Sequence, residues 1–545
     1  MHIYTHIIHT YTHTYTQTHT YTHHVQLLII IFFNFPSSQM LGLLGSEGMG
    51  YFNSAYEIYA LFCVISTSGL PVAMSVMIAR QGENSAQKIY KSAKKIFLAL
   101  GIVGMAIMIA FSQPFASFLK NEKAAVCIFA IAPTVLFICL CSAYRGYFQG
   151  LGSMRQTAAS QVIEALGKLL LGLLFAYIAY RAGAQPQYVA AAAVMGLTLG
   201  VAASTLYLAL CKRRRARTLE VSVSTEKIGK KLLRAAIPIT LSSAVLSVTK
   251  LIDMSMILRR LQGIGYSPES AFSAYGNYTT LALPIFSLAP ALIVSVSLPL
   301  IPALSEAIAL GDGQKQVKTV SQALKLTCMI SMPLGVGMSL FSHQILELVF
   351  SGQDSAIALC APLLSILGIT VTSSCLITVG NAILQAYGKP TVPIFSMMLG
   401  AAVKIVLAYV LIGNQSIALY GAPISTFACD LVINVVNFYH IFKLVPCRIE
   451  QGKIMTVPFV AAVLSIALSR LAYSYVSQRA TSAIATLICI VAAAVLYGAA
   501  CLAMGIIKKK DVAEILSSKQ KSEERKNDRT AKERQNILPS RQGQI

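Results

Sequence analysis

The chain has no tryptophan, and charged residues make up only 12% of it, about half the share that soluble domains carry. Acidic residues are scarce as well, with 21 Asp and Glu against 44 Lys and Arg. Hydrophobic residues reach 55% and gather in runs of 20 or more, which excludes an ordinary soluble enzyme and predicts an all-α integral membrane protein. Without tryptophan, tyrosine must supply the aromatic belt at the membrane interfaces.

Recognisable motifs of reaction chemistry are missing too. The sequence has no Walker A motif or other nucleotide-binding pattern, and its 12 cysteines show no paired metal-ligand spacing; Cys139 and Cys141 lie too close together for a zinc knuckle. We therefore predict a protein that is not an enzyme and uses no cofactor and no metal. The cysteines are expected to be reduced packing residues. Energy for any transport would come from ion gradients or from downstream consumption of the product.

Residues 1–24 form a low-complexity tract of Thr, His and Tyr that holds seven of the nine histidines. A His-rich tract is one possible metal binder. The alternative, which we favour, is a translated CA/TA dinucleotide repeat, because Tyr, Thr and His in this order are what such a repeat encodes. Residues 25–35 are apolar but cover only about half a crossing. We expect a truncated or degraded first helix and a dispensable tract.

Thirteen long apolar segments follow between residues 51 and 507, so about fourteen transmembrane helices are predicted if the first is complete. The net charge of +23 does not indicate nucleic acid, because the basic residues concentrate in alternate loops and in the tail. This asymmetry predicts a multi-pass membrane protein with both termini cytoplasmic. The loops predicted to lie outside contain few basic residues: Lys120, Lys123, Arg181, Arg259, Arg260 and Arg479.

An internal repeat divides the chain. Gln149, Gly152 and Lys168 recur in the same order as Gln385, Gly388 and Lys404. An even number of helices in each half makes the repeats parallel, so we predict two pseudo-symmetric six-helix lobes plus two C-terminal helices, a common transporter plan. The predicted parts are a tract (1–24), an N-terminal lobe (25–211), a basic cytoplasmic linker (212–231), a C-terminal lobe (232–442), two extra transmembrane helices (443–507) and a basic cytoplasmic tail (508–545).

Several basic residues fall inside apolar segments, where an ionisable group is costly and usually functional. Lys168 and Lys404 lie near the middle of repeat-equivalent segments, and Arg145 lies near the inner end of another. Glu164 is four residues before Lys168, so a local ion pair is the alternative to a cavity-facing lysine. Lys404 has no carboxylate at that spacing. The predicted substrate-binding residues, which suit a large anion such as a diphosphate, are Arg145, Lys168, Lys404, Lys250 and Glu164.

Two carboxylates are candidates for coupling transport to a cation. Asp253 lies three residues after Lys250, so a structural ion pair between the two is the alternative reading. Asp430 shares a helix face with Asn434 and Asn437, and this polar stripe either joins helices or binds a cation; joining helices is the favoured reading. If transport is coupled to a cation, Asp253 and Asp430 are the predicted coupling residues.

Three stretches resemble the stage V sporulation protein B group of polysaccharide exporters, within the multidrug/oligosaccharidyl-lipid/polysaccharide (MOP) exporter superfamily. They are LGSEGMGYFNSAYEIYALFCVISTSGLPVAMS (44–75), AYRGYFQGLGSMRQTAASQVIEALGK (143–168) and LLRAAIPITLSSAVLSVTKLIDMSMILRRL (232–261). The resemblance covers roughly 41–507. It implies fourteen helices, a cavity whose Arg and Lys residues bind diphosphate, and a cation site in the second lobe.

The match is specific at some positions and departs from the group at others. Arg145, Glu164, Lys168 and Asp253 fall on the group's pattern, whereas Gln156 stands where proline is expected and Lys168 where arginine is common. The group's first helix lines the cavity and often carries basic residues; here the Thr/His/Tyr tract and the short apolar piece replace it.

The predicted function is a flippase that exports a lipid-linked saccharide diphosphate, plausibly lipid II or a polysaccharide precursor, by alternating access in cell-wall or spore-cortex synthesis. Its expected partners are the bilayer, that substrate and a monovalent cation, with cell-wall synthases as further candidates. Two alternatives remain: a cation-coupled multidrug antiporter of the same fold, and a non-transporting scaffold that recruits cell-wall synthases.

Overall fold

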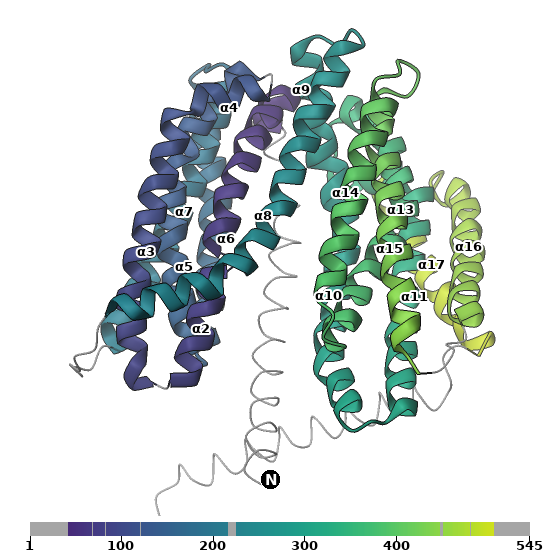
Figure 1. The fold of residues 1–545 in the computed structure, drawn as a ribbon. Helices are drawn as coiled ribbons and strands as arrows, with labels where there is room; N and C mark the ends of the chain where they lie inside the picture. The colour runs from purple at the N-terminus through teal and green to yellow at the C-terminus, as the bar shows by residue number, and fades with distance from the viewer. Residues whose placement is uncertain are drawn as a thin grey trace, which may run out of the picture. The chain divides into compact units, whose positions relative to one another are not determined.

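The structure is a computed structural model that describes residues 42–505, with gaps at 68, 82, 120, 216–224, 447–450 and 480. The tract 1–24, the short apolar piece 25–35, residues 216–224 of the linker and the tail therefore lie outside the described residues. The described part is helical throughout and contains no strand, which confirms the all-α prediction (Figure 1).

The first helical stretch covers residues 42–67 and leads into α2. The remaining elements follow in chain order: α2 (Gly69–Gln81), α3 (Glu83–Ala110), α4 (Ser112–Phe118), η1 (Glu122–Ala124), α5 (Ala125–Gly150), α6 (Met154–Arg181), α7 (Pro186–Arg215), α8 (Thr225–Gly263), α9 (Pro268–Asn277), η2 (Tyr278–Ala282), α10 (Leu283–Ala309), α11 (Gly313–Leu340), α12 (Ser342–Val349), α13 (Asp354–Ala386), α14 (Thr391–Ile412), η3 (Ala418–Tyr420), α15 (Gly421–Leu444), α16 (Gln451–Val476) and α17 (Ser482–Ala503).

Twelve helical stretches of the described chain are long and apolar enough to cross a membrane. They correspond to twelve of the thirteen apolar segments predicted from the sequence. The remaining predicted segment corresponds to α8, which is 39 residues long and is not among the twelve. The predicted segment 271–309 is interrupted rather than continuous, because α9 passes into the short π-helix η2 before α10 begins. π-Helical turns are rare and often mark functional positions.

The predicted repeat is visible in the backbone. Gly152 and Gly388 both adopt a left-handed conformation, with φ of +69° and +68°, directly after α5 and α13. Their amides donate to the carbonyls of Gln149 and Gln385, each at 3.0 Å. Glycine reaches this conformation without strain, so the same turn leads into α6 and α14 in the two halves.

The short helices repeat as well. α4 and α12 each follow a phenylalanine, Phe111 or Phe341, whose backbone angles are nearly the same (φ −106°, ψ 18° and φ −113°, ψ 21°). The long helices before them, α3 and α11, pack against α5 and α13 respectively. The order of elements in the first half therefore recurs in the second, whereas the residue boundaries proposed for the lobes stay a prediction.

α8 is the element that contacts both halves. It packs against α2 and α3 of the first half and against α14 of the second. Figure 1 shows it as a long, bent helix. α16 and α17 form a separate compact unit in which the two helices pack on each other, and the hydroxyl of Ser469 donates to the carbonyl of Cys489 at 2.6 Å.

Cysteine chemistry follows the prediction. Eleven cysteines within the described residues are free, and nine of them are buried. A buried free thiol behaves as a small apolar side chain, which is the packing role expected from the sequence.

Candidate functional site

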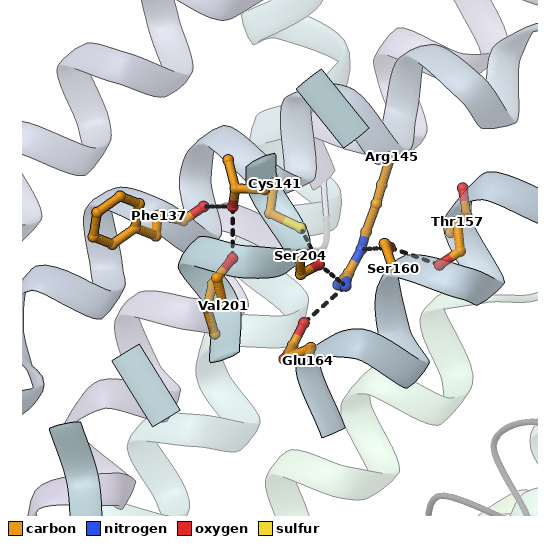
Figure 2. A network of polar contacts seen from close by, with 9 residues as sticks. Phe137, Cys141, Arg145, Thr157, Ser160, Glu164, Val201 and Ser204 are labelled. Carbon is orange, nitrogen blue, oxygen red and sulfur yellow. Dashed lines mark hydrogen bonds and ion pairs between the residues drawn. The ribbon is translucent and has the colours of Figure 1, made fainter. Parts of the chain in front are cut away.

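Arg145 lies at the centre of a polar network formed by α5, α6 and α7 (Figure 2). Its Nε donates to the hydroxyl of Ser160 at 2.9 Å, and one terminal nitrogen donates to Glu164 Oε2 at 2.7 Å and to Ser204 Oγ at 3.4 Å. The Arg145 side chain is only 13% exposed. A charge-assisted pair of this kind allows a guanidinium to stay ionised away from water.

Hydroxyl and thiol groups complete this network. Ser160 donates to the carbonyl of Thr157 at 2.7 Å, and Ser204 lies 3.4 Å from the sulfur of Cys141. These contacts hold Ser160 and Ser204 in place around the guanidinium, as Figure 2 shows. Sequence analysis missed both serines, because a single serine in an apolar helix gives no signal of its own.

Lys168 lies one turn further along α6 than Glu164. Its Nζ is 4.5 Å from the centroid of the Tyr56 ring, a cation–π distance. Glu164, which the i, i+4 spacing offered as a local partner of Lys168, also pairs with Arg145 across helices. Tyr56 belongs to the helical stretch 42–67, so Lys168 connects α6 to that stretch.

The second half places a neutral network where the first has Arg145. Asn381 occupies the position equivalent to Arg145, and Ser396 the position equivalent to Ser160. Asn437 donates to Asn381 at 2.9 Å and accepts from Ser396 at 2.7 Å. The repeat thus keeps a polar junction between the same helices but removes the charge. The repeat offset would have identified Ser160 and Ser396 from the sequence.

Lys404 forms an ion pair with Asp253, which joins α14 to α8. Nζ lies 2.7 Å from Oδ2, and the two side chains are 20% and 19% exposed. The other carboxylate oxygen of Asp253 is buried and has no hydrogen-bond partner among the described residues. The alternative pairing of Asp253 with Lys250 is not tested, because the Lys250 side chain lies outside the described residues. Sequence spacing missed the partner of Lys404, because it lies on another helix.

Asp430 is 8% exposed and lies in the polar stripe of α15. It accepts a hydrogen bond from Ser374 of α13. Asn434 donates to the carbonyl and hydroxyl of Ser373 at 2.9 and 2.8 Å. Together with the Asn437 contacts, these bonds agree with the favoured reading of the stripe as a junction between helices. Asn434 Oδ1 is buried and unpartnered among the described residues.

The two lobes also meet at one end of the helices. Asn53 of stretch 42–67 donates to the hydroxyls of Thr279 and Thr280 in the π-helix η2, at 2.7 and 3.1 Å. The backbones approach so closely there that a Cβ added at Gly276 would lie 2.7 Å from the amide nitrogen of Gly50. Lys123 lies 3.7 Å from both Glu47 and Glu269 and so bridges the same two elements.

A second contact between the lobes involves the end of α4. The carbonyl of Phe118 accepts hydrogen bonds from Ser255 Oγ at 3.1 Å and from an Arg259 terminal nitrogen at 3.0 Å. Both donors lie on α8. The lobes are therefore joined at this end by polar contacts from stretch 42–67 with α9 and η2, and from α4 with α8. We call these contacts the lobe latch.

Two helical repeats with ionic groups inside membrane-length helices are the plan of a membrane transporter, and the comparisons with known proteins place the chain in the MOP superfamily. The chain belongs to the polysaccharide biosynthesis protein family, whose sequence pattern matches residues 23–308, and the MatE pattern matches residues 238–410. The protein is accordingly a multi-pass membrane transporter of the flippase type.

Relatives support this assignment. The chain is 26% identical over 495 residues to stage V sporulation protein B of Bacillus subtilis (strain 168), covering 87% of this chain and 92% of the relative. It is 22% identical over 391 residues to the lipid II flippase MurJ of the same organism, covering 67% and 71%.

Solved structures share the fold. An inward closed conformation of the lipid II flippase MurJ superimposes with a TM-score of 0.66 at 13% identity, covering 87% of this chain and 98% of that one. An inward-facing multidrug resistance MATE family transporter gives a TM-score of 0.63 at 16% identity, covering 76% and 94%. Identities this low establish the fold alone.

Proposed function

We propose that this protein moves a lipid-linked saccharide diphosphate to the outer leaflet by alternating access, in cell-wall or spore-cortex synthesis. The observation that carries the proposal is the placement of Lys168 and Lys404. Each lies in the helix that follows an equivalent left-handed glycine turn, at the same distance in sequence from that glycine. Two ammonium groups at equivalent positions, one in each lobe, suit a large anion held between the lobes.

Arg145 adds a third cationic group, and its setting differs from that of the lysines. Glu164 and two serines hold the guanidinium in place. We infer that Arg145 presents a fixed, partly neutralised charge, whereas the Lys168 ammonium lies over the Tyr56 ring and adds a second cation on α6. The Lys404 ammonium is shared with Asp253, so a diphosphate bound there would compete with that carboxylate.

The lobe latch supports alternating access. It joins the two lobes at one end, as expected for a transporter closed on one side of the membrane. The topology predicted from Lys and Arg places Lys123, Glu269 and the α4–η1 connection outside the cell and both termini in the cytoplasm. The latch would therefore be the outer gate of an inward-facing state.

A cation-coupled multidrug antiporter of the same fold is the second candidate. It requires carboxylates that can receive a cation, and Asp253 and Asp430 were the residues proposed for this role. Asp253 already has an ammonium group as its counter-ion, and Asp430 accepts from Ser374. A cation at Asp253 would share the carboxylate with the Lys404 ammonium, whose positive charge opposes it, which favours the lipid diphosphate. A scaffold for cell-wall synthases would keep the same fold and transport nothing.

Transport in proteoliposomes separates these functions. Purified protein is reconstituted with a fluorescent polyprenyl diphosphate sugar, and the fraction of label that an impermeant quencher reaches is followed over time. A flippase makes the inner-leaflet label accessible, and Lys404→Ala lowers the rate. An antiporter instead moves a cationic dye, and a scaffold moves neither compound.

A further inference from the structure

Lys212 of α7 lies in a cage of tyrosine rings at one end of the N-terminal lobe. Its Nζ is 3.9 Å from the centroid of Tyr90 on α3 and 5.3 Å from that of Tyr147 on α5. Both rings are buried, and Tyr144 packs on Tyr90 with centroids 5.5 Å apart. The rings attract the ammonium and fix its position. Lys212 as a whole is partly exposed.

Two further lysines interact electrostatically with Lys212. Lys91 and Lys94 of α3 are exposed and interact with it electrostatically. Among the described side chains, no carboxylate forms an ion pair with Lys91, Lys94 or Lys212. Cations that lie close together repel one another, and an anion that joins them removes this repulsion.

The internal repeat shows that the fold does not need these residues. α3 and α11 share one buried register, in which Ala86, Tyr90, Ala93 and Phe97 correspond to Gln316, Val320, Ala323 and Thr327. In that register the second lobe has Val320 for Tyr90, Ser321 for Lys91 and Leu324 for Lys94. The glycine turns align α5 with α13, and there the second lobe has Gly380 for Tyr144 and Ile383 for Tyr147. The counterpart of Lys212 is Arg448, so the repeat keeps a basic residue at that position, and its structure lies outside the described residues.

Charge is also handled differently in the second lobe. Lys315, at the start of α11, pairs with Glu306 at 2.9 Å. Positive-inside topology alone would be satisfied by lysines in both lobes. The tyrosine cage, together with Lys91 and Lys94, is therefore a specialisation of the first lobe.

An exposed apolar surface lies next to Lys94 on α3. Leu98 and Ile102 follow Lys94 at four-residue steps on α3, so they share one helix face, and they are 38% and 47% exposed. This face lies within the membrane-spanning stretch Ser85–Ala110. A ligand with an anionic head at the lysines and acyl chains along Leu98 and Ile102 matches it. A soluble phosphate would leave the apolar part uncovered.

We propose that Lys91, Lys94 and Lys212 form a binding site for the phosphate of an anionic membrane lipid headgroup, with the acyl chains lying along the exposed face of α3. The site does not depend on the proposed transport function, because none of its residues belongs to the Arg145, Lys168 or Lys404 groups.

The test measures lipid bound to purified full-length protein by native mass spectrometry after delipidation and addition of phosphatidylglycerol or phosphatidylcholine. The site variant is Lys91→Gln/Lys94→Gln/Lys212→Gln. The matched control, Lys315→Gln/Lys318→Gln/Lys325→Gln, removes three charges from the corresponding helix of the second lobe. Lys91→Gln/Lys94→Gln, whose side chains are exposed, serves if the triple variant folds poorly.

The wild-type protein should bind phosphatidylglycerol about tenfold more tightly than phosphatidylcholine, and each lysine should contribute up to about fivefold. The site variant should lose the preference and the control should retain it. Equal affinity of the wild-type protein for the two lipids, or an equal loss in the control, overturns the proposal. Displacement of the lipid by equimolar inorganic pyrophosphate would assign the lysines to a soluble anion and also overturn it.

Discussion

The ammonium of Lys404 lies 2.7 Å from Oδ2 of Asp253, and this ion pair joins α14 to α8. α8 also packs on α2 and α3 of the other lobe. The pair therefore fixes a helix that contacts both lobes, and a substrate anion that attracts Lys404 would loosen α8 from α14 of the second lobe. The geometry suggests how substrate binding and lobe movement are linked.

Removal of Lys404 alone should destabilise the protein. Lys404→Met leaves the Asp253 carboxylate poorly solvated and without its cation, at a cost of up to about 3 kcal/mol. Lys404→Met/Asp253→Asn removes both charges and should recover most of that loss. Thermal unfolding of the purified variants in detergent measures both effects. An additive loss in the double variant would show that the pair is not an energetic unit.

Variants of Arg145 and Glu164 should separate an effect on unfolding temperature from an effect on transport. Arg145→Ala leaves Glu164 without its cation, so the variant should unfold at a lower temperature than the wild-type protein. Arg145→Gln/Glu164→Gln should regain stability, because neutral amides can bond to each other and to Ser160. Transport of the lipid diphosphate should stay low in this double variant. Full transport with both charges absent would reduce Arg145 to a structural role.

The transport rate should depend on the sign of the charge at position 168. Lys168→Arg preserves the cation over Tyr56 and should retain most of the transport rate, whereas Lys168→Ala should lower it. Lys168→Glu should be worse than alanine, because it adds repulsion of a diphosphate to the lost attraction. Initial flipping rates, normalised to folded protein, give the ranking. Equal rates for alanine and glutamate would argue against an anion at this position.

The lobe latch should depend on the glycine contact. A Cβ at Gly276 would meet the backbone of Gly50 at 2.7 Å, so Gly276→Ala should favour separation of the lobes at this end. Asn53→Cys in this background should then react faster with an impermeant thiol reagent. Gly337→Ala is the control, since nothing lies within 4 Å of its Cβ position. A rate that Gly276→Ala leaves unchanged would mean that the latch does not open to this reagent.

The sequence predicted much of the fold because hydrophobicity determines it. The apolar segments correspond to the observed helices, and the repeat of Gly152 in Gly388 reappears as the same left-handed turn. The break at η2 escaped prediction, because a π-turn changes hydrogen bonding without interrupting the apolar pattern. The start of α3 at Glu83 also preceded the predicted limit, since its first turns are polar and lie at the membrane surface.

The charged residues were found from the sequence, but their partners on other helices were not. Spacing along one helix suggested Glu164 for Lys168 and Lys250 for Asp253, and the structure adds Arg145 as a partner of Glu164 and Lys404 as a partner of Asp253 across helices. Burial makes an ion pair between helices as available as one within a helix, and no local pattern records it. Asn437 was found from its helix face, whereas Ser204 gave no signal of its own.

The central claim is that a lipid-linked diphosphate crosses the membrane through this protein, and flipping in proteoliposomes tests it most directly. Vesicles that contain the wild-type chain should expose a fluorescent polyprenyl diphosphate sugar to an external quencher well beyond the fraction exposed in protein-free vesicles. Lys168→Glu/Lys404→Glu vesicles with equal amounts of folded protein should remain near the protein-free value. Quenching in wild-type vesicles that does not exceed the protein-free value, under conditions in which a lipid II flippase is active, would contradict the account.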